Sequence, residues 1–435
     1  MTFNSLPLFP QIIEAIELCG YHRLTPVQEQ VLPLALARHD LIACAQTGTG
    51  KTAAYAIPLL QHLMNNRTPE HHVNHTLSAL VITPTRELAI QVADNITQYS
   101  QVTELKTLAV YGGANINPQR KALGAGVDVL VATPGRLFDL LGQGAVDLSC
   151  IDTFIIDEAD RMLDLGFVKD IERIKKLLNG QHCCQLFSAT YSPAVEQLAQ
   201  QMLNQPKRVN IKASQQPSTI EQWIYPVDKR RKAELLAELV GRNNWRQVLV
   251  FVSTKESAEL LLKELRLDGL KGAVFHGDKT QGARNRALEL FKSGELRVLV
   301  ATDVAARGLD IEALPLVINI ELPFAAEDYV HRIGRTGRAG LPGKAISLVS
   351  RNDEAMMTEI EALIGERIRR QVQPGYEEGA PLPERYRQLA VEPKPKRAYK
   401  DNKRGNAKRP STKRSSTKHP SAKNGGTSQR TTKRR

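Results

Sequence analysis

Short runs of apolar and β-branched residues alternate with longer stretches of helical periodicity over residues 20–350, and this alternation limits the possible folds more than any other feature. Such runs indicate strands buried on both faces, and a strand, a helix and a further strand form the βαβ unit of a parallel sheet. The predicted strands are 41–45, 79–83, 127–132 and 154–156, then 248–252, 272–275, 297–301, 317–320 and 345–348.

A polar segment without clear periodicity, 204–219, separates the two sets of strands and contains Pro206 and Pro217, which indicates an interdomain linker. We therefore predict an α/β protein with two tandem domains whose parallel sheets are covered by helices. The expected boundaries are 1–205 for the first domain, 206–218 for the linker, 219–375 for the second domain and 376–435 for a C-terminal tail.

The positive charge of the chain is concentrated in this tail. The formal net charge is +13, and residues 391–435 hold 16 Lys or Arg against two acidic residues, which leaves the first 390 residues near neutral. Residues 394–435 are almost without apolar side chains, so we expect this segment to be disordered. It has no aromatic residue after Tyr399, and phosphate charge alone would have to hold a nucleic acid there.

Composition argues against a membrane protein and against a disulfide framework. No apolar run approaches the roughly 18 residues that cross a bilayer, and we expect a cytoplasmic protein. The five cysteines form no C-x-x-C pair, so buried packing is the expected role of each. A histidine cluster at 71, 72 and 75 could bind a metal, but its polar surroundings favour a solvated loop.

A glycine-rich segment, 45–52, follows a predicted strand and leads into a predicted helix at 53–65. This is the context of a phosphate-binding loop, in which Gly48 and Gly50 turn backbone N–H groups toward phosphate oxygens. Lys51 would reach the outer phosphates, and Thr52 would ligate Mg²⁺. The candidate nucleotide residues of the loop are Ala45, Gln46, Thr47, Gly48, Thr49, Gly50, Lys51 and Thr52.

Two carboxylates follow the predicted strand 154–156 directly. Asp157 suits Mg²⁺ ligation, and Glu158 suits polarising an attacking water. An acidic stretch alone usually begins a solvated helix, but the phosphate-binding loop upstream favours the catalytic interpretation.

The segment 331–338 contains three arginines and two glycines. Guanidinium groups neutralise charge on a transferred phosphoryl group, so arginines from the second domain would complete a nucleotide site in the first. A basic surface loop is the alternative for this segment alone.

Together these segments resemble the DEAD-box RNA helicases of superfamily two over residues 3–350, most nearly the bacterial RhlE type. The resemblance implies two RecA-like domains, with ATP and Mg²⁺ as cofactors. It also implies further nucleotide contacts, coupling residues between hydrolysis and strand separation, and γ-phosphate contacts. The further nucleotide contacts are Phe3, Tyr21, Thr25, Gln28 and Asp310. The coupling residues are Asp160, Ser188, Thr190 and His331, and the γ-phosphate contacts are Arg335 and Arg338.

The resemblance also implies RNA-contacting residues in both domains. These are Pro84, Thr85, Arg86, Gly113, Thr133, Gly135 and Arg136, followed by Thr254, Gln281, Arg284 and Thr302.

Phosphate-binding loops also occur in transporters and signalling switches. The lack of a membrane segment argues against a transporter, and the second domain argues against a small signalling switch. RNA rather than DNA as the partner rests on the resemblance. The predicted activity is ATP-dependent, local and non-processive separation of short RNA duplexes, with ribosome biogenesis and RNA degradation as implied settings. An ATP-gated RNA clamp or annealing chaperone is the alternative.

Overall fold

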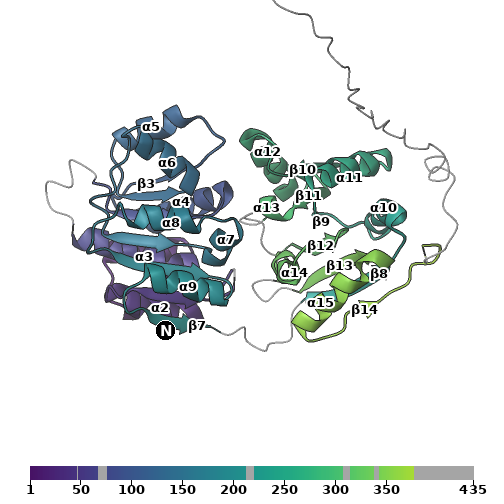
Figure 1. Ribbon diagram of the computed structural model, residues 1–435, viewed down its shortest axis with the longest axis horizontal. Helices are drawn as coiled ribbons and strands as arrows, with labels where there is room; N and C mark the ends of the chain where they lie inside the picture. The colour runs from purple at the N-terminus through teal and green to yellow at the C-terminus, as the bar shows by residue number, and fades with distance from the viewer. Residues whose placement is uncertain (47, 67–75, 212–219, 307–313, 338–341, 377–435) are drawn as a thin grey trace, which may run out of the picture. The chain divides into compact units, whose positions relative to one another are not determined.

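The computed structural model describes residues 1–46, 48–66, 76–211, 220–306, 314–337 and 342–376. The described chain forms two seven-stranded sheets, each flanked by helices, and both can be followed in Figure 1. All the strand pairs within these residues are parallel, as the alternating pattern predicts. The predicted fold of two tandem RecA-like α/β domains is confirmed.

The first sheet has the strand order β3-β4-β2-β5-β6-β1-β7. Its strands are β1 Leu41–Cys44, β2 Ala79–Ile82, β3 Thr107–Val110, β4 Val129–Ala132, β5 Thr153–Ile156, β6 Cys183–Ser188 and β7 Lys207–Asn210. Successive side chains of a strand face opposite sides, so Leu41 and Ala43 enter one core and Ile42 the other.

Two groups of helices cover the two faces of this sheet. The core that contains Leu41 also holds residues of α1 Pro10–Leu18, α2 Pro26–Leu36, α3 Lys51–Asn65 and α4 Arg86–Tyr99. The core that contains Ile42 holds residues of α5 Ile116–Gly124, α6 Pro134–Gly142, α7 Ala159–Asp164, α8 Val168–Lys175 and α9 Pro193–Met202. A central strand with an apolar core on each face explains the continuous apolar runs in the sequence.

The second sheet has the order β10-β11-β9-β12-β13-β8-β14. Its strands are β8 Ile220–Pro226, β9 Val248–Val252, β10 Gly272–Phe275, β11 Val298–Thr302, β12 Leu316–Asn319, β13 Gly343–Val349 and β14 Arg369–Arg370. Its helices are α10 Lys232–Arg242, α11 Lys255–Leu267, α12 Gln281–Lys292, α13 Asp303–Ala306, α14 Ala326–Ile333 and α15 Glu354–Ile364. Counted from its own first strand, each sheet runs 3-4-2-5-6-1-7, so the two domains share one topology.

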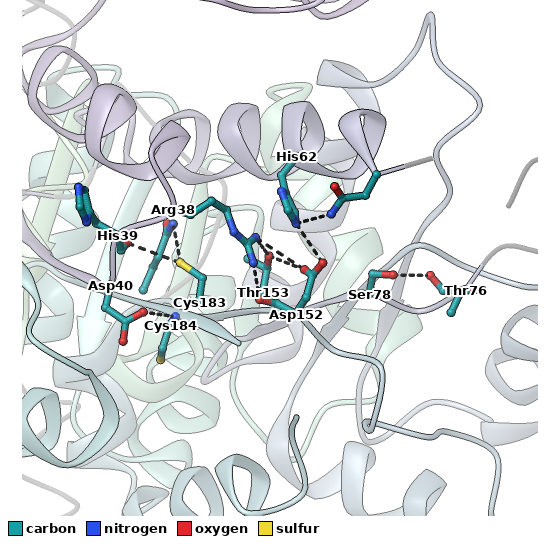
Figure 2. A network of polar contacts seen from close by, with 12 residues as sticks. Arg38, His39, Asp40, His62, Thr76, Ser78, Asp152, Thr153, Cys183 and Cys184 are labelled. Carbon is teal, nitrogen blue, oxygen red and sulfur yellow. Dashed lines mark hydrogen bonds and ion pairs between the residues drawn. The ribbon is translucent and has the colours of Figure 1, made fainter. Parts of the chain in front are cut away.

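Polar groups at the amino end of the first sheet bond one another (Figure 2). Arg38 donates to the Thr153 hydroxyl at 2.7 Å and to the Asp152 carbonyl at 3.0 Å. The carboxylate of Asp152 lies 3.0 Å from His62 Nε2, and that of Asp40 accepts the Cys184 N–H at 2.8 Å. Burial alone would raise the pKa of Asp152, but the hydrogen bonds from His62 and Thr153 lower it. These contacts fasten the helices and strands at this end of the sheet.

One buried arginine joins α14 to α13 and to the strands β9 and β12 of the second domain. The Arg332 side chain donates to both carboxylate oxygens of Asp303, at 2.6 and 2.7 Å. It also donates to the Asn319 side chain at 3.1 Å and to the Glu321 carbonyl at 2.6 Å, and its guanidinium lies over the ring of Phe251. Arg332 is therefore a structural member of the basic segment 331–338.

The structure differs from the sequence prediction at several positions. β3, β6, β7, β8 and β14 were not predicted as strands. Residues 207–210, expected in the linker, form β7 at the edge of the first sheet, and the rest of that linker lies largely outside the described residues. Tyr376, expected to begin the tail, is buried beneath the Arg231 guanidinium, and residues 377–435 lie outside the described residues.

Not all of the cysteines are buried, contrary to expectation. Cys44, Cys183 and Cys184 are buried, but Cys19 is half-buried and Cys150 is exposed. The histidine cluster at 71–75 lies outside the described residues. Among the helices described, none combines the length and the apolar character needed to cross a membrane.

We predict that Arg332→Met lowers the free energy of unfolding of the second domain by about 3 kcal/mol, because it leaves the mostly buried carboxylate of Asp303 without its partner. The exposed Arg351 provides the control, and Arg351→Met should change stability by less than about 0.5 kcal/mol. Urea unfolding followed by circular dichroism measures both variants. Equal unfolding midpoints would show that the Arg332 contacts contribute nothing net.

Candidate functional site

The strand order divides the candidate residues of the first domain into two groups along one edge of the sheet. The predicted nucleotide and coupling loops follow β1, β5 and β6, which are neighbours in the order β5-β6-β1. The predicted RNA-contacting loops follow β2, β3 and β4, which are also neighbours. Ligands of parallel α/β sheets bind beyond the carboxyl ends of the strands, so this edge is the candidate site.

The phosphate-binding loop has the backbone shape that its glycines permit. Gly48 and Gly50 have φ of 80° and 93°, in the left-handed region that side chains disfavour. The Thr49 hydroxyl closes the loop by donating to the Gln46 carbonyl at 2.7 Å. Lys51 begins α3 and donates through Nζ to the Ala45 carbonyl. Burial lowers the pKa of Lys51, although Asp157 opposes that shift. Thr47 lies outside the described residues.

Gln28 joins the predicted nucleotide contacts that precede β1 to this loop. Its side chain accepts the Thr25 N–H at 2.9 Å and donates to the Gly50 carbonyl at 3.2 Å. A Cβ on Gly50 would lie 2.5 Å from Gln28 Nε2, so this approach requires glycine at position 50. Phe3 is buried in the core that includes α1 to α4, whereas Tyr21 is exposed, with its ring 6.0 Å from that of Tyr99.

Asp157 is a deeply buried carboxylate at the end of β5. Its Oδ2 accepts from the Tyr55 hydroxyl at 2.8 Å, and its Oδ1 accepts from the Glu158 N–H at 2.9 Å. Burial and the adjacent Glu158 raise the pKa of Asp157 to about 6, with Lys51 and Tyr55 acting in the opposite direction. A buried carboxylate with a raised pKa favours a nearby cation, which would compensate its charge.

Glu158 adopts a backbone conformation that is uncommon for a residue with a side chain. Its φ of 50° and ψ of 55° are left-handed, and it forms the N-terminal boundary of α7. Its carboxylate is mostly buried and lies 3.4 Å from the Arg161 guanidinium. Strained backbone of this kind is concentrated at functional sites, and here it sets the direction of the carboxylate predicted to act on water.

Asp160 links the acidic segment to the loop after β6. Its Oδ2 accepts from the N–H groups of Ala189 and Thr190, at 3.1 and 3.0 Å, and from the Thr190 hydroxyl at 3.0 Å. The fully buried Ser188 hydroxyl donates to the Thr190 carbonyl at 2.8 Å. The predicted coupling residues Asp160, Ser188 and Thr190 are thus brought together, because β5 and β6 are neighbouring strands.

Arg86 and Gly113 meet at the carboxyl ends of β2 and β3. A Cβ on Gly113 would lie only 2.0 Å from Arg86 Nη1, and its φ of 75° also favours glycine. By contrast, a Cβ on Gly112 would meet nothing within 4 Å. The predicted RNA contacts Pro84 and Thr85 precede α4, and Thr85 caps this helix by accepting the Leu88 N–H.

Arg136 lies in the same group, near the start of α6. The side chain is buried and donates to the Ala114 carbonyl at 2.9 Å, yet its Nη1 has no hydrogen-bond partner among the described residues. Buried donors are rarely left unsatisfied, so this atom favours an anionic ligand. Thr133 is buried immediately before α6, and Gly135 lies within that helix.

The predicted RNA contacts of the second domain follow three neighbouring strands, β9, β10 and β11. Thr254 is exposed after β9 and caps α11 by accepting the Ser257 N–H at 3.0 Å. Gln281 and Arg284 lie in the first turn of α12, with the Arg284 guanidinium 4.5 Å from the centre of the Phe275 ring. Thr302 ends β11. Both domains therefore place their predicted RNA residues after topologically equivalent strands.

The nucleotide-directed residues of the second domain are described only in part. His331 lies on α14, 3.7 Å from the Asp328 carboxylate, and Arg335 is buried just beyond that helix. Asp310 and Arg338 lie outside the described residues.

The second domain has a lysine at the position equivalent to Lys51, but the protein itself satisfies that lysine. Lys232 begins the helix after the first strand of its sheet, as Lys51 does. Its Nζ donates to the Asp353 carboxylate at 2.7 Å and to the Ile320 carbonyl at 3.0 Å. The loop before Lys232 also lacks glycine. These features distinguish the described loop before Lys232 from the predicted phosphate-binding loop before Lys51.

The donor set at the nucleotide loop suits magnesium. Thr52 and Asp157 offer oxygen atoms, which Mg²⁺ prefers, and phosphate oxygens and waters normally complete its coordination. Among the described residues, no group of three or more His, Cys, Asp or Glu side chains forms a cage for a metal ion. A site completed by a nucleotide fits this arrangement.

Comparison with known proteins agrees with this division of the chain. The DEAD/DEAH box helicase family matches residues 25–198, and the helicase conserved C-terminal domain matches residues 231–340.

The chain is 39% identical to the DEAD-box ATP-dependent RNA helicase CshA of Bacillus subtilis strain 168, over 87% of this chain and 75% of that protein. It is 41% identical to the ATP-dependent RNA helicase RhlB of Shewanella baltica strain OS155, over 84% of each chain. The structure of S. cerevisiae Dbp5 bound to RNA and ADP BeF3 aligns with a TM-score of 0.76 and 30% identity, over 85% of this chain and 95% of Dbp5. The chain belongs to the DEAD-box ATP-dependent RNA helicase family.

Sequence reasoning missed two side chains that act within the candidate site. Tyr55 bonds Asp157, and the signal available was its place one turn after Thr52 on the predicted helix. Gln119 is buried and bonds both the N–H and the carbonyl of Tyr111, at 3.1 and 3.2 Å, which secures the loop that carries Gly113. No sequence pattern pointed to Gln119.

We predict that Gly113→Ala weakens binding of single-stranded RNA about tenfold, the equivalent of one charged hydrogen bond, because its Cβ displaces the Arg86 guanidinium. The left-handed backbone should also cost roughly 1 kcal/mol of stability. Gly112→Ala is the matched control and should bind RNA like the wild type. Fluorescence anisotropy measures the affinities, and equal affinities for the two variants would remove Arg86 from the RNA site.

Proposed function

We propose that this protein separates short RNA duplexes locally and non-processively, coupling ATP hydrolysis to closure of its two domains on single-stranded RNA. The observation that carries the proposal is the set of bonds from Asp160 to Ala189 and Thr190. They connect the segment that would hydrolyse ATP to the loop that would respond to it. A change at the nucleotide would therefore alter contacts after both β5 and β6.

The first domain would hold the nucleotide. Gln28 would read the adenine edge while it supports Gly50, and Lys51 would leave the Ala45 carbonyl to bind the outer phosphates. Thr52 and Asp157 would hold Mg²⁺, which when bound neutralises charge on phosphate oxygens.

Hydrolysis would require residues from both domains. The Glu158 carboxylate would orient and polarise the water that attacks the γ-phosphate. Arg335 and Arg338 would neutralise the charge that develops on the transferred phosphoryl group, and Asp310 would contact the ribose. Because these last three residues belong to the second domain, hydrolysis would wait for closure.

RNA would lie across the loops after β2, β3 and β4 and after β9, β10 and β11. Arg136 Nη1, which has no hydrogen-bond partner among the described residues, and the guanidinium of Arg86 would supply phosphate contacts in the first domain. A bent single strand bound by both domains would exclude its complementary strand. The 2′-hydroxyl is the group by which the site would distinguish RNA from DNA.

We further propose that the protein is cytoplasmic and acts in ribosome biogenesis or RNA degradation, with the basic tail adding contacts to the RNA backbone. The similarity to CshA and RhlB supports a bacterial type of DEAD-box helicase. Among the bacterial DEAD-box helicases, the RhlE type is our specific proposal, based on the amino acids that occupy the motifs.

Steady-state ATP hydrolysis measured alone, with single-stranded RNA and with DNA of the same sequence tests the proposal, and only RNA should stimulate it strongly. Glu158→Gln should retain ATP and RNA binding but lose at least about 100-fold in turnover, because the attacking water loses its base. Glu14→Gln, an exposed change on α1, is the control. Equal stimulation by DNA would contradict the RNA assignment. Annealing without duplex displacement would identify a clamp instead.

Removal of residues 391–435 tests the role of the basic tail. We expect RNA affinity to fall and its dependence on salt to become shallower, because each lost phosphate contact removes about 0.7 from the slope of log K against log salt for a single strand. Anisotropy titrations from low to high salt measure this slope. An unchanged slope would mean that the tail serves another partner.

A further inference from the structure

Tyr55 lies on α3, three residues after Thr52 and four after Lys51. Residues at these spacings share one face of a helix, so the tyrosine extends the face of α3 that begins at the phosphate-binding loop. None of the motifs identified above includes it.

The Tyr55 hydroxyl fixes one oxygen of the carboxylate predicted to bind magnesium. It donates to Asp157 Oδ2 at 2.8 Å, while the Glu158 N–H occupies Oδ1 at 2.9 Å. With one donor on each oxygen, rotation of the carboxylate about its terminal bond would break a hydrogen bond. A carboxylate accepts about four hydrogen bonds or ligands in total, so each oxygen retains a lone pair for a cation or a water.

The tyrosine ring is fixed as firmly as its hydroxyl. Tyr55 is only 1% exposed, and its ring packs against Phe187 with centroids 4.9 Å apart. Phe187 directly precedes Ser188 on β6, so the Tyr55 side chain connects the phosphate-loop helix, on which it lies, to the acidic segment and to the strand that leads to the coupling loop. In a close-packed interior, such a side chain cannot move away without disturbing all three.

We propose that Tyr55 is a positioning residue for magnesium: its hydroxyl holds the Asp157 carboxylate in the orientation that receives the Mg²⁺ of the bound nucleotide. This inference rests on the proposed function, in which Thr52 and Asp157 hold the ion. The hydroxyl is the essential part, because phenylalanine would fill the same space. Groups that hydrogen-bond a metal-ligating side chain typically change metal affinity about 10- to 100-fold when removed.

The test compares Tyr55→Phe with Tyr329→Phe in the full chain. Tyr329 is fully buried in the second domain and donates to the Gln222 side chain at 2.9 Å, so this control loses a comparable hydrogen bond far along the chain from Asp157. Binding of a fluorescent ADP is followed as Mg²⁺ is added from a metal-free solution. Thermal unfolding of each variant is recorded first, and Tyr55→Met provides a second hydroxyl-free variant should Tyr55→Phe not fold.

We expect Tyr55→Phe to raise the Mg²⁺ concentration for half-maximal ADP binding about tenfold, with metal-free ADP affinity unchanged and Tyr329→Phe like the wild type. A Mg²⁺ dependence equal to that of the wild type would overturn the inference and leave the proposed function intact. A wild-type chain whose ADP binding ignored Mg²⁺ would overturn the magnesium assignment itself, and the role of Tyr55 with it.

Discussion

Parallel pairing of β5, β6 and β1 is the constraint on which the candidate nucleotide site depends. The pairing aligns Ile156 with Leu186 and Cys44 with Ser188, so the loops that follow these strands begin at one edge of the sheet. Asp160 can then bond the loop after β6, and Asp157 can meet Tyr55 of the helix after β1. Each contact joins segments far apart in sequence, and each would be lost if the strand order changed.

The two domains show how one topology supports two roles. Both sheets have the same strand order, and in both a lysine begins the helix after the first strand. Glycines before Lys51 leave backbone N–H groups available to an anion, whereas Asp353 neutralises Lys232 within the second domain. Burial would raise the pKa of Asp353, but its hydrogen bond with Lys232 lowers it, which indicates a carboxylate that stays ionised for this pair. The nucleotide-binding capacity thus depends on a few loop residues and not on the fold.

Glycine and arginine define the other half of the edge in the first domain. Arg86 lies so close to Gly113 that a Cβ there would displace its guanidinium, and Gln119 holds the preceding backbone at Tyr111. Arg136 completes this group with a buried nitrogen atom that has no hydrogen-bond partner in the described part of the chain. These contacts order the loop after β3, which has no regular secondary structure. They thereby hold the guanidinium groups of Arg86 and Arg136 at a constant spacing.

Sequence alone determined the α/β class, most central strands and the nucleotide loop, because apolar runs and glycine-lysine patterns are local signals. It did not reveal β7, an edge strand in which only Val209 is buried, or β8, in which the consecutive polar residues Glu221 and Gln222 interrupt the apolar pattern. Only the tertiary structure decided the strand order, the separation of Arg332 from the phosphate-directed arginines and the bond between Tyr55 and Asp157. Those features depend on contacts between residues tens to a hundred positions apart, which no local pattern encodes.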